Sequence, residues 1–458
     1  MRRTMVLDVV GLTPELVGEH TPALAALAKS GAMRPIATVL PAVTCSVQST
    51  FTTGVLPSGH GCVGNGWYYR ELAEIAFWKQ SNQLVSGDKI WDEGRRRDAN
   101  FRCAKLFWWF NMYSTADFTV TPRPMYPADG RKLPDIYTQP PELRAALQDQ
   151  LGQFPLFDFW GPRAGITSSK WITAAAVDVW RRNHPTLALV YLPHLDYDLQ
   201  RQGPHGPGIP AALRAIDALC GDLIEIARKD DARVLVVSEY GITPVDGAVH
   251  INRVLRDAKL LVVRDERGRD QLDAGASQAF AVADHQIAHV YVRGVPTDQV
   301  KALLEATPGI ERVLDGDGKR AAGLDHPRSG DLVAISTANK WFTYYHWTDD
   351  DRAPDFARTV DIHRKPGYDP VELFLDPTLF APQVAVLWKL AQRKLGFRSL
   401  LDVIALDASL VKGSHGRLTD SPDHGPVAIS SEPLPDGPIA ATSIKTLVLD
   451  HVFGCFVD

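Results

Sequence analysis

A hydroxyl and a carboxylate near the start of the chain have the types and setting needed for phosphoryl-transfer chemistry. Thr44 stands in a run of small residues, 41–61, where a turn could open a helix. A hydroxyl in that position can act as a nucleophile beside the free N–H groups of the helix start. Asp8 ends the apolar run Met5-Val6-Leu7, which is typical of a metal ligand at the carboxyl edge of a sheet. If Asp8 and Thr44 share a metal, the chain is a phosphoryl-transfer hydrolase.

Two more carboxylates follow apolar runs further along the chain. Asp196 comes after Leu187–Leu192, and Glu239 comes after Arg233–Val237. Carboxylates that converge at one sheet edge repel each other, so they need cations between them. Divalent metals with oxygen and imidazole ligands meet that need.

The elements that must position these side chains alternate between strand and helix. Buried-type strands separated by helices predict an α/β fold with a mainly parallel sheet that is covered on both faces. The expected strands are Met5–Val10, Leu187–Leu192 and Arg233–Val237, and the expected helices are Pro22–Ser30, Ser46–Thr53, Ala174–Asn183 and Ala211–Lys229.

Two segments interrupt this alternation. Residues 100–170 are rich in proline and aromatic residues and are expected to form a cap inserted into the core. Residues 258–345 contain further short apolar runs and are expected to form a subsidiary layer within it. The remaining ranges, 1–99 and 171–458, form the expected catalytic core.

Composition excludes several classes of protein. The chain has 458 residues, 45% of them apolar and 22% charged, which is typical of a soluble globular protein. A net charge of −5 argues against a nucleic-acid polymer as partner. No apolar stretch is long enough to span a bilayer, so no membrane partner is expected. Five scattered cysteines indicate a reducing, cytoplasmic location. Oligomeric state stays open.

The motifs together resemble the alkaline phosphatase superfamily, in particular its type I phosphodiesterase and nucleotide pyrophosphatase branch. The family's Thr-Gly-x-x-Pro-x-x-His-Gly and its Gly-Asn pair are matched in full, and its later metal motifs in part. The matching residues are Thr53-Gly54, Pro57, His60-Gly61, Gly64-Asn65, Asp196, Gly203-Pro204, Ser238, Gly241 and Ser414-His415-Gly416.

This resemblance implies an alkaline-phosphatase-like three-layer α/β/α sandwich with an inserted cap. It also implies divalent metal ions, with zinc as the expected metal. One ion would be held by Asp8, Thr44 and Glu239, and a second by Asp196 and His415. Thr44 would attack phosphorus and form a phospho-threonine, while Asn65 would hold a phosphoryl oxygen.

The chain departs from the family at three ligand positions. Gln200 and Tyr240 replace histidines, and Glu239 replaces an aspartate. These changes favour a different metal or a single ion. His363 could supply a replacement ligand or bind a substrate phosphate. Three other histidines are interpreted as structural, namely His194, His285 and His289.

The resulting hypothesis is a metal-dependent hydrolase of phosphodiester or pyrophosphate bonds in a small soluble substrate. Two alternatives stay open: a phosphomonoester or phosphonate hydrolase of the same superfamily, and a catalytically weakened member that binds a phosphorylated metabolite. Thr44 by itself could also be an ordinary helix N-cap.

Overall fold

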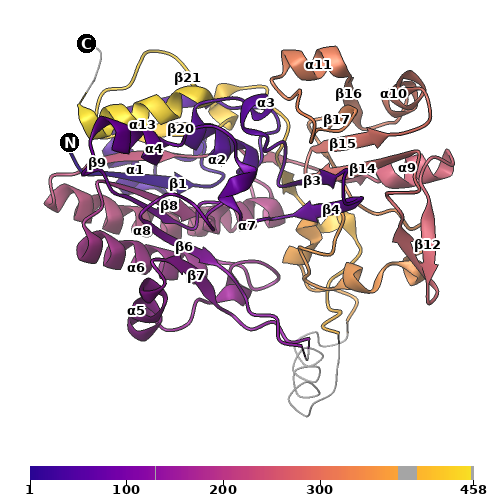
Figure 1. The fold of residues 1–458 in the computed structure, drawn as a ribbon, viewed down its shortest axis with the longest axis horizontal. Helices are drawn as coiled ribbons and strands as arrows, with labels where there is room; N and C mark the ends of the chain where they lie inside the picture. The colour runs from indigo at the N-terminus through magenta and orange to yellow at the C-terminus, as the bar shows by residue number, and fades with distance from the viewer. Residues whose placement is uncertain (129, 380–399, 455–458) are drawn as a thin grey trace.

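The fold is built on one large sheet, in a computed structural model that describes residues 1–128, 130–379 and 400–454 (Figure 1). β1 (Thr4–Val9) lies at its centre and pairs in parallel with β8 (Leu187–Leu192) and β9 (Arg233–Val237). All six residues of β1 are buried, as expected for a strand covered on both faces. The sheet has nine strands in the order β21-β2-β20-β9-β1-β8-β5-β6-β7, and its other strands are β2 (Ala32–Ala37), β5 (Cys103–Leu106), β6 (Phe118–Pro122), β7 (Ile136–Gln139), β20 (Val427–Ser430) and β21 (Ile439–Ala440).

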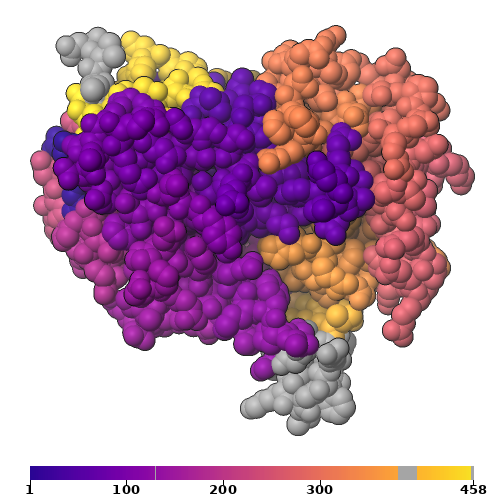
Figure 2. Space-filling model, in the orientation of Figure 1, coloured from indigo at the N-terminus to yellow at the C-terminus, as the bar shows by residue number. Residues whose placement is uncertain are grey.

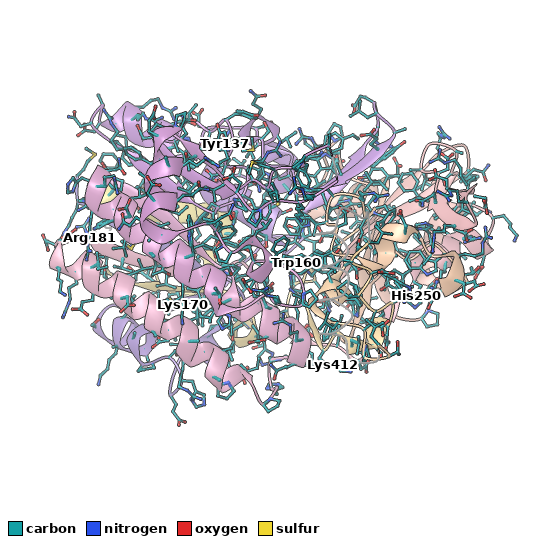
Figure 3. All side chains as sticks on the ribbon, turned by 90° about the horizontal axis from the view of Figure 1, so that it is seen from below. Tyr137, Trp160, Lys170, Arg181, His250 and Lys412 are labelled. Carbon is teal, nitrogen blue, oxygen red and sulfur yellow. The ribbon has the colours of Figure 1, made fainter. Side chains whose placement is uncertain are left out.

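Helices cover both faces of this sheet (Figure 1). On one face α6 packs on α8 and α8 on α1, and on the other face α13 packs on α2 and α4. The predicted mainly parallel, three-layer α/β/α fold is confirmed. The helix bounds are α1 (Pro22–Ser30), α2 (Thr44–Thr53), α3 (Pro57–His60), α4 (Ile90–Arg97), α5 (Glu142–Leu151), α6 (Ile166–Asn183), α7 (His194–Gln202), α8 (Ile209–Lys229) and α13 (Ile444–Phe453). Figure 3 shows α6 from outside, with Lys170 and Arg181 labelled.

A second, smaller sheet lies beside the first. Residues 258–345, the region expected to be a subsidiary layer, contain its four antiparallel strands in the order β14-β15-β17-β16. The β3–β4 hairpin packs on β14, and Figure 2 shows this early part of the chain, in indigo to purple, against the orange and salmon region. The elements here are β3 (Gly66–Tyr69), β4 (Glu74–Phe77), α9 (Ile251–Asp257), β14 (Ala279–Asp284), β15 (Ile287–Val292), α10 (Thr297–Glu305), β16 (Ile310–Leu314), α11 (Gly316–Ala321) and β17 (Leu332–Ser336).

Short strands and 3-10 turns complete the described chain. The short strands are β10 (Thr243–Pro244), β11 (Gly247–Val249), β12 (Val263–Glu266), β13 (Arg269–Leu272), β18 (Lys340–Phe342) and β19 (Gly413–Ser414). The 3-10 turns are Pro14–Leu16, Asn82–Leu84, Leu156–Asp158, Asp350–Arg352, Asp355–Arg358, Pro370–Leu373, Ala408–Leu410, Pro422–His424 and Ala441–Ser443. Within the described ranges, no helix is both long and apolar enough to cross a membrane.

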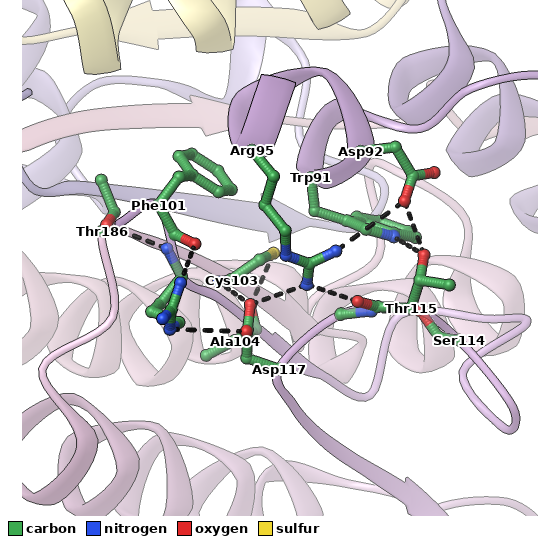
Figure 4. A network of polar contacts seen from close by, with 12 residues as sticks. Trp91, Asp92, Arg95, Phe101, Cys103, Ala104, Ser114, Thr115, Asp117 and Thr186 are labelled. Carbon is green, nitrogen blue, oxygen red and sulfur yellow. Dashed lines mark hydrogen bonds and ion pairs between the residues drawn. The ribbon is translucent and has the colours of Figure 1, made fainter. Parts of the chain in front are cut away.

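Residues 100–170 differ from the expected inserted cap, because β5, β6 and β7 all belong to the central sheet. A network of polar contacts joins α4 to β5 and to the residues before β6 (Figure 4). Asp117 accepts hydrogen bonds from Cys103 N at 2.8 Å and from Arg95 of α4 at 2.9 Å. The aromatic residues of this region suggested a separate cap, but they pack around an edge of the main sheet instead.

Candidate active site

Thr44 is the first residue of α2, a helix that ends at Gly54 in a left-handed conformation. Val43 occupies the N-cap position, so Thr44 does not cap the helix. The Thr44 side chain is 3% exposed, and its Oγ1 lies 3.1 Å from the Tyr240 hydroxyl. Thr44 is therefore directed into a buried polar site at the carboxyl edge of the central sheet.

The Gln48 side chain lies between two strand-end carboxylates. Gln48 Nε2 donates to Asp8 Oδ2 at 3.1 Å and to Glu239 Oε1 at 2.6 Å. Gln48 Oε1 accepts from Trp109 N at 2.7 Å, which fixes the amide with its N–H groups toward the carboxylates. The structure thus joins Asp8 and Glu239, as the sequence predicts. Gln48 was not predicted from the sequence, because its only signal there is its position one helical turn after Thr44.

Asp196 lies in the first turn of α7, and both of its carboxylate oxygens accept hydrogen bonds. Gln200, four residues later on the same helix face, donates to Asp196 Oδ2 at 2.7 Å. The Tyr240 hydroxyl donates to Asp196 Oδ1 at 3.3 Å. Gln200 Oε1 in turn accepts from the Tyr368 hydroxyl at 3.1 Å, which fixes the orientation of this amide too. The two residues that replace family histidines therefore both bind Asp196.

Tyr240 is held in place by a close approach of the backbone behind it. A Cβ on Gly241 would lie 1.7 Å from His424 O, so only glycine fits after Tyr240. The Tyr240 ring stacks on the His415 ring, with centroids 3.5 Å apart and planes 6° apart. The strand end at 238–241 thus directs the Tyr240 hydroxyl between Thr44 and Asp196.

Asn65 connects the start of α2 to the second sheet. Asn65 Oδ1 accepts from Cys45 N at 3.0 Å, the first backbone N–H after Thr44. Asn65 N and Nδ2 donate to Asp284 at 2.7 and 3.1 Å. The two groups expected to hold a phosphoryl oxygen are therefore paired with each other, and Asn65 keeps one amide hydrogen for a ligand. Asp284 ends β14 of the second sheet, so the strand-end pattern of the central sheet does not indicate its place in the site.

Two buried histidines line the same site. His285 Nδ1 bonds to Asp284 Oδ1 at 2.9 Å, and His415 Nδ1 bonds to Ala42 O at 2.8 Å. These partners place a hydrogen on each Nδ1 and leave each Nε2 as an acceptor. The two rings lie 3.7 Å apart, and neither Nε2 has a hydrogen-bond partner among the described residues. His285, interpreted as structural from the sequence, therefore belongs to the site.

His363 lies apart from this network. Its side chain is exposed, and its Nδ1 is 3.3 Å from Phe77 O. No contact among the described residues connects it to Asp8, Glu239 or Asp196. His194 follows β8 at the start of α7 and is buried without a partner on Nδ1 in the described part of the chain.

The electrostatics of the site follow from burying acids that form no ion pair with a basic side chain in the described part of the chain. Burial raises the pKa of Glu239 to about 7 and that of Asp196 to about 7. Burial and the neighbouring Glu239 raise the pKa of Asp8 well above its usual range. Burial lowers the pKa values of His285 and His415, so both rings are neutral.

These residues do not fit the expected pair of zinc ions. Within residues 1–128, 130–379 and 400–454, no group of three or more His, Cys, Asp or Glu side chains is placed to hold a metal ion. Asp196 has both oxygens engaged by donors, and Gln200 presents its N–H groups to Asp196 rather than a ligand atom to a cation. Gln48 likewise presents a donor to Asp8 and Glu239. A zinc ligand must present a lone pair, and these three contacts present hydrogens.

The fold and the site together define a member of the alkaline phosphatase superfamily. A family model, type I phosphodiesterase / nucleotide pyrophosphatase, matches residues 4–369, and the chain belongs to this family of phosphoric-ester hydrolases. The predicted family is therefore confirmed. A search among curated proteins finds no match.

Solved structures show the same fold at low sequence identity. Phosphonoacetate hydrolase from Sinorhizobium meliloti 1021, in complex with phosphonoacetate, has a TM-score of 0.64 and 16% identity, over 98% of this chain and 96% of that chain. Murine ectonucleotide pyrophosphatase / phosphodiesterase 5 has a TM-score of 0.60 and 14% identity, over 99% and 95% of the two chains. The human enzyme has a TM-score of 0.58 and 12% identity, over 100% and 96%.

Proposed function

We propose that this protein hydrolyses a phosphodiester or pyrophosphate bond of a small soluble molecule, with Thr44 as the nucleophile. The observation that carries this proposal is the position of Thr44, buried at the first residue of α2 with Oγ1 facing the Tyr240 hydroxyl. The positive end of the helix dipole favours an anionic phosphoryl group beside that oxygen. We place the reaction in the cytoplasm, since the four cysteines of the described chain, Cys45, Cys62, Cys103 and Cys220, are free thiols.

The site supports a two-step reaction through the chain's own groups. In the first step a bond forms between Thr44 Oγ1 and phosphorus, and the bond to the leaving oxygen breaks. The Thr44 proton passes to the Tyr240 oxygen while Tyr240 passes its own proton to Asp196 Oδ1, along contacts of 3.1 and 3.3 Å. A carboxyl with a pKa of about 7 suits a general base near neutral pH. The leaving oxygen takes a proton from solvent water. In the second step the resulting hydroxide forms a bond to phosphorus, the bond from phosphorus to Thr44 Oγ1 breaks, and Asp196 returns its proton to Thr44 through Tyr240.

Asn65 would orient the phosphoryl group. Its remaining amide hydrogen and the Cys45 N–H lie at the start of α2, where a ligand oxygen could replace their mutual contact. Asp284 holds Asn65 through two hydrogen bonds, so this donor is positioned before substrate arrives.

The experiment compares Thr44→Ala with Thr53→Ala on bis-(p-nitrophenyl) phosphate and p-nitrophenyl phosphate. Thr53 is a buried threonine at the other end of the same helix and provides the matched control. We expect loss of Thr44 to lower kcat by about 10³-fold or more, and the control to keep its rate. A preference for the diester supports the main proposal, and a preference for the monoester supports a phosphomonoesterase. Equal rates for Thr44→Ala and wild type would exclude the nucleophile.

The pairing of Asn65 with Cys45 N supports a second candidate, a member that binds a phosphorylated metabolite without turning it over. Phosphonoacetate and AMP are suitable probes, because structural neighbours were solved in complex with them. Calorimetric binding of either molecule, with no hydrolysis of diester, monoester or phosphonate, would favour this candidate over the hydrolase.

A further inference from the structure

Every carboxylate at the edge of the central sheet meets a neutral donor of the protein. Gln48 Nε2 lies within hydrogen-bond distance of both Asp8 and Glu239, and Gln200 and Tyr240 occupy the two oxygens of Asp196. We infer that these amide and hydroxyl donors have taken over the positions of both cations, so that the site works without a bound metal ion.

The orientation of the Gln48 amide supports this inference, because the surrounding chain fixes it. Trp109 N donates to Gln48 Oε1 at 2.7 Å, and the buried Lys105 Nζ donates to Trp109 O at 2.7 Å. Turning the amide to present its oxygen to a cation would leave Trp109 N without an acceptor and would place an N–H group against it. The amide is therefore held as a donor.

The orientation of Gln200 is fixed in the same way. The Tyr368 hydroxyl donates to Gln200 Oε1 at 3.1 Å, so the amide nitrogen is the atom that meets Asp196. The Tyr368 ring also stacks on His285, with centroids 3.7 Å apart, which keeps its hydroxyl in place. Both amides that face carboxylates thus have their oxygens engaged on the far side.

The described acceptor atoms of the site on which a cation could still bind are Asp8 Oδ1, Glu239 Oε2 and the Nε2 atoms of His285 and His415. Asp8 Oδ1 and Glu239 Oε2 are buried without a hydrogen-bond partner in the described ranges. Their carboxyl groups lie within hydrogen-bond reach of each other, so one shared proton can satisfy the pair. The competing occupant, one hard cation on Asp8, Glu239 and Thr44, is an outcome that the experiment must distinguish.

The first test is the metal content of the wild-type protein, purified without chelator and measured by plasma mass spectrometry. We expect well below one equivalent of zinc, manganese, magnesium or iron per chain. Added zinc, manganese or magnesium should leave Tm unchanged, because an ion that binds the folded state would raise it. One or more retained equivalents, or a rise in Tm that depends on ion concentration, would overturn the inference.

The second test restores the family residues with the triple variant Gln200→His/Glu239→Asp/Tyr240→His. We expect this variant to acquire at least one equivalent of zinc and to show a Tm that rises with added zinc. The matched control, Tyr113→His/Gln299→His, adds two histidines at exposed positions and should gain neither. A folded triple variant that stays free of zinc would show that these donors are not what excludes the metal.

Neither measurement depends on hydrolysis, so the inference and the proposed function can fail separately. The wild-type measurement needs no substitution and decides the question even if the triple variant does not fold. The kcat of Thr44→Ala tests the nucleophile, and the metal content of the wild-type protein is a separate measurement.

Discussion

Two buried acidic clusters in this protein neutralise their charge in different ways. In the segment 361–373, Lys365 Nζ lies 2.8 Å from Asp369 and 2.8 Å from Glu372, with all three side chains buried. At the edge of the central sheet, Asp8 and Glu239 share the Gln48 amide as a neutral donor. The first cluster carries its own cation, whereas a neutral amide faces both acids of the second.

This difference separates a cluster with a structural role from a cluster whose charge changes with pH. Burial lowers the pKa of Lys365, but the charges of Asp369 and Glu372 outweigh burial and raise it, so the ammonium stays charged over the whole working range of pH. Glu372 also accepts a hydrogen bond from Trp160 Nε1 at 2.5 Å, and Trp160 is labelled in Figure 3. By contrast, Glu239 and Asp196 change charge near pH 7. The sheet-edge cluster should therefore respond to pH near neutrality.

Removing the resident cation should give the largest effect on stability. Lys365→Met leaves two buried carboxylates without their partner, which we expect to cost about 3–5 kcal/mol of unfolding free energy. Urea unfolding measures this cost, with the exposed Lys29→Met as control. A cost below about 1 kcal/mol, as for a surface ion pair, would show that the triad does not stabilise the segment.

The pH response of Glu239 should give the next largest effect. Its pKa is raised from 4.5 to about 7, so its contribution to stability is complete below pH 4.5 and is lost as pH rises through 7. Glu239→Gln should therefore match wild type near pH 5 and exceed it by about 3 kcal/mol near pH 8. Unfolding at both pH values, with the exposed Glu74→Gln as control, measures the difference. A difference that does not change with pH would contradict this assignment.

Removing the shared donor should have a smaller effect. Gln48→Met removes the donor that Asp8 and Glu239 share and the acceptor of Trp109 N, and we expect a loss of about 1–3 kcal/mol of unfolding free energy. The loss of stability should be greater at pH 8 than at pH 5, because ionised carboxylates form stronger hydrogen bonds with the amide donor than protonated carboxyl groups do. Gln299→Met, at an exposed position on α10, is the control. Wild-type stability in Gln48→Met would mean that the amide does not compensate the acids.

The smallest effect on stability is expected for the Tyr240 hydroxyl. Tyr240→Phe keeps the ring stacked on His415 and removes the contacts to Thr44 and Asp196, at a cost of about 0.5–1.5 kcal/mol. We expect a strong decrease in kcat together with this small change in unfolding free energy, because the proton path from Thr44 is broken. The exposed Tyr113→Phe is the control, and unchanged kcat in Tyr240→Phe would remove Tyr240 from the reaction.

Much of the fold could be predicted from the sequence because its signals are local. The run before Asp8 and the apolar stretch Leu187–Leu192 are strands at the expected positions, and α1 has the expected bounds, Pro22–Ser30. The assignment of 100–170 to a cap differs from the structure because aromatic density does not distinguish a sheet edge from a separate lid. Only pairing across the sheet reveals β5 to β7, and pairing is not a local property.

The site was predictable only where a motif carried it. Thr44, Asp8, Glu239 and Asp196 were predicted to lie together, and contacts through Gln48 and Tyr240 join them. Asp284 lies 219 residues from Asn65 along the chain, so no spacing indicates their contact. Gln48 could not be recognised because a buried glutamine has many roles, and its role here is set by Trp109 N on one side and two acids on the other.

The donors at positions 200 and 240 have a consequence for how such a site can arise and change. In the genetic code a histidine codon is a single-base change from a glutamine codon and from a tyrosine codon, and aspartate is likewise a single-base change from glutamate. Each replacement at positions 200, 239 and 240 is therefore accessible to ordinary point mutation in either direction. A lineage could lose or regain its metal by such steps while the helix that presents Thr44 stays in place.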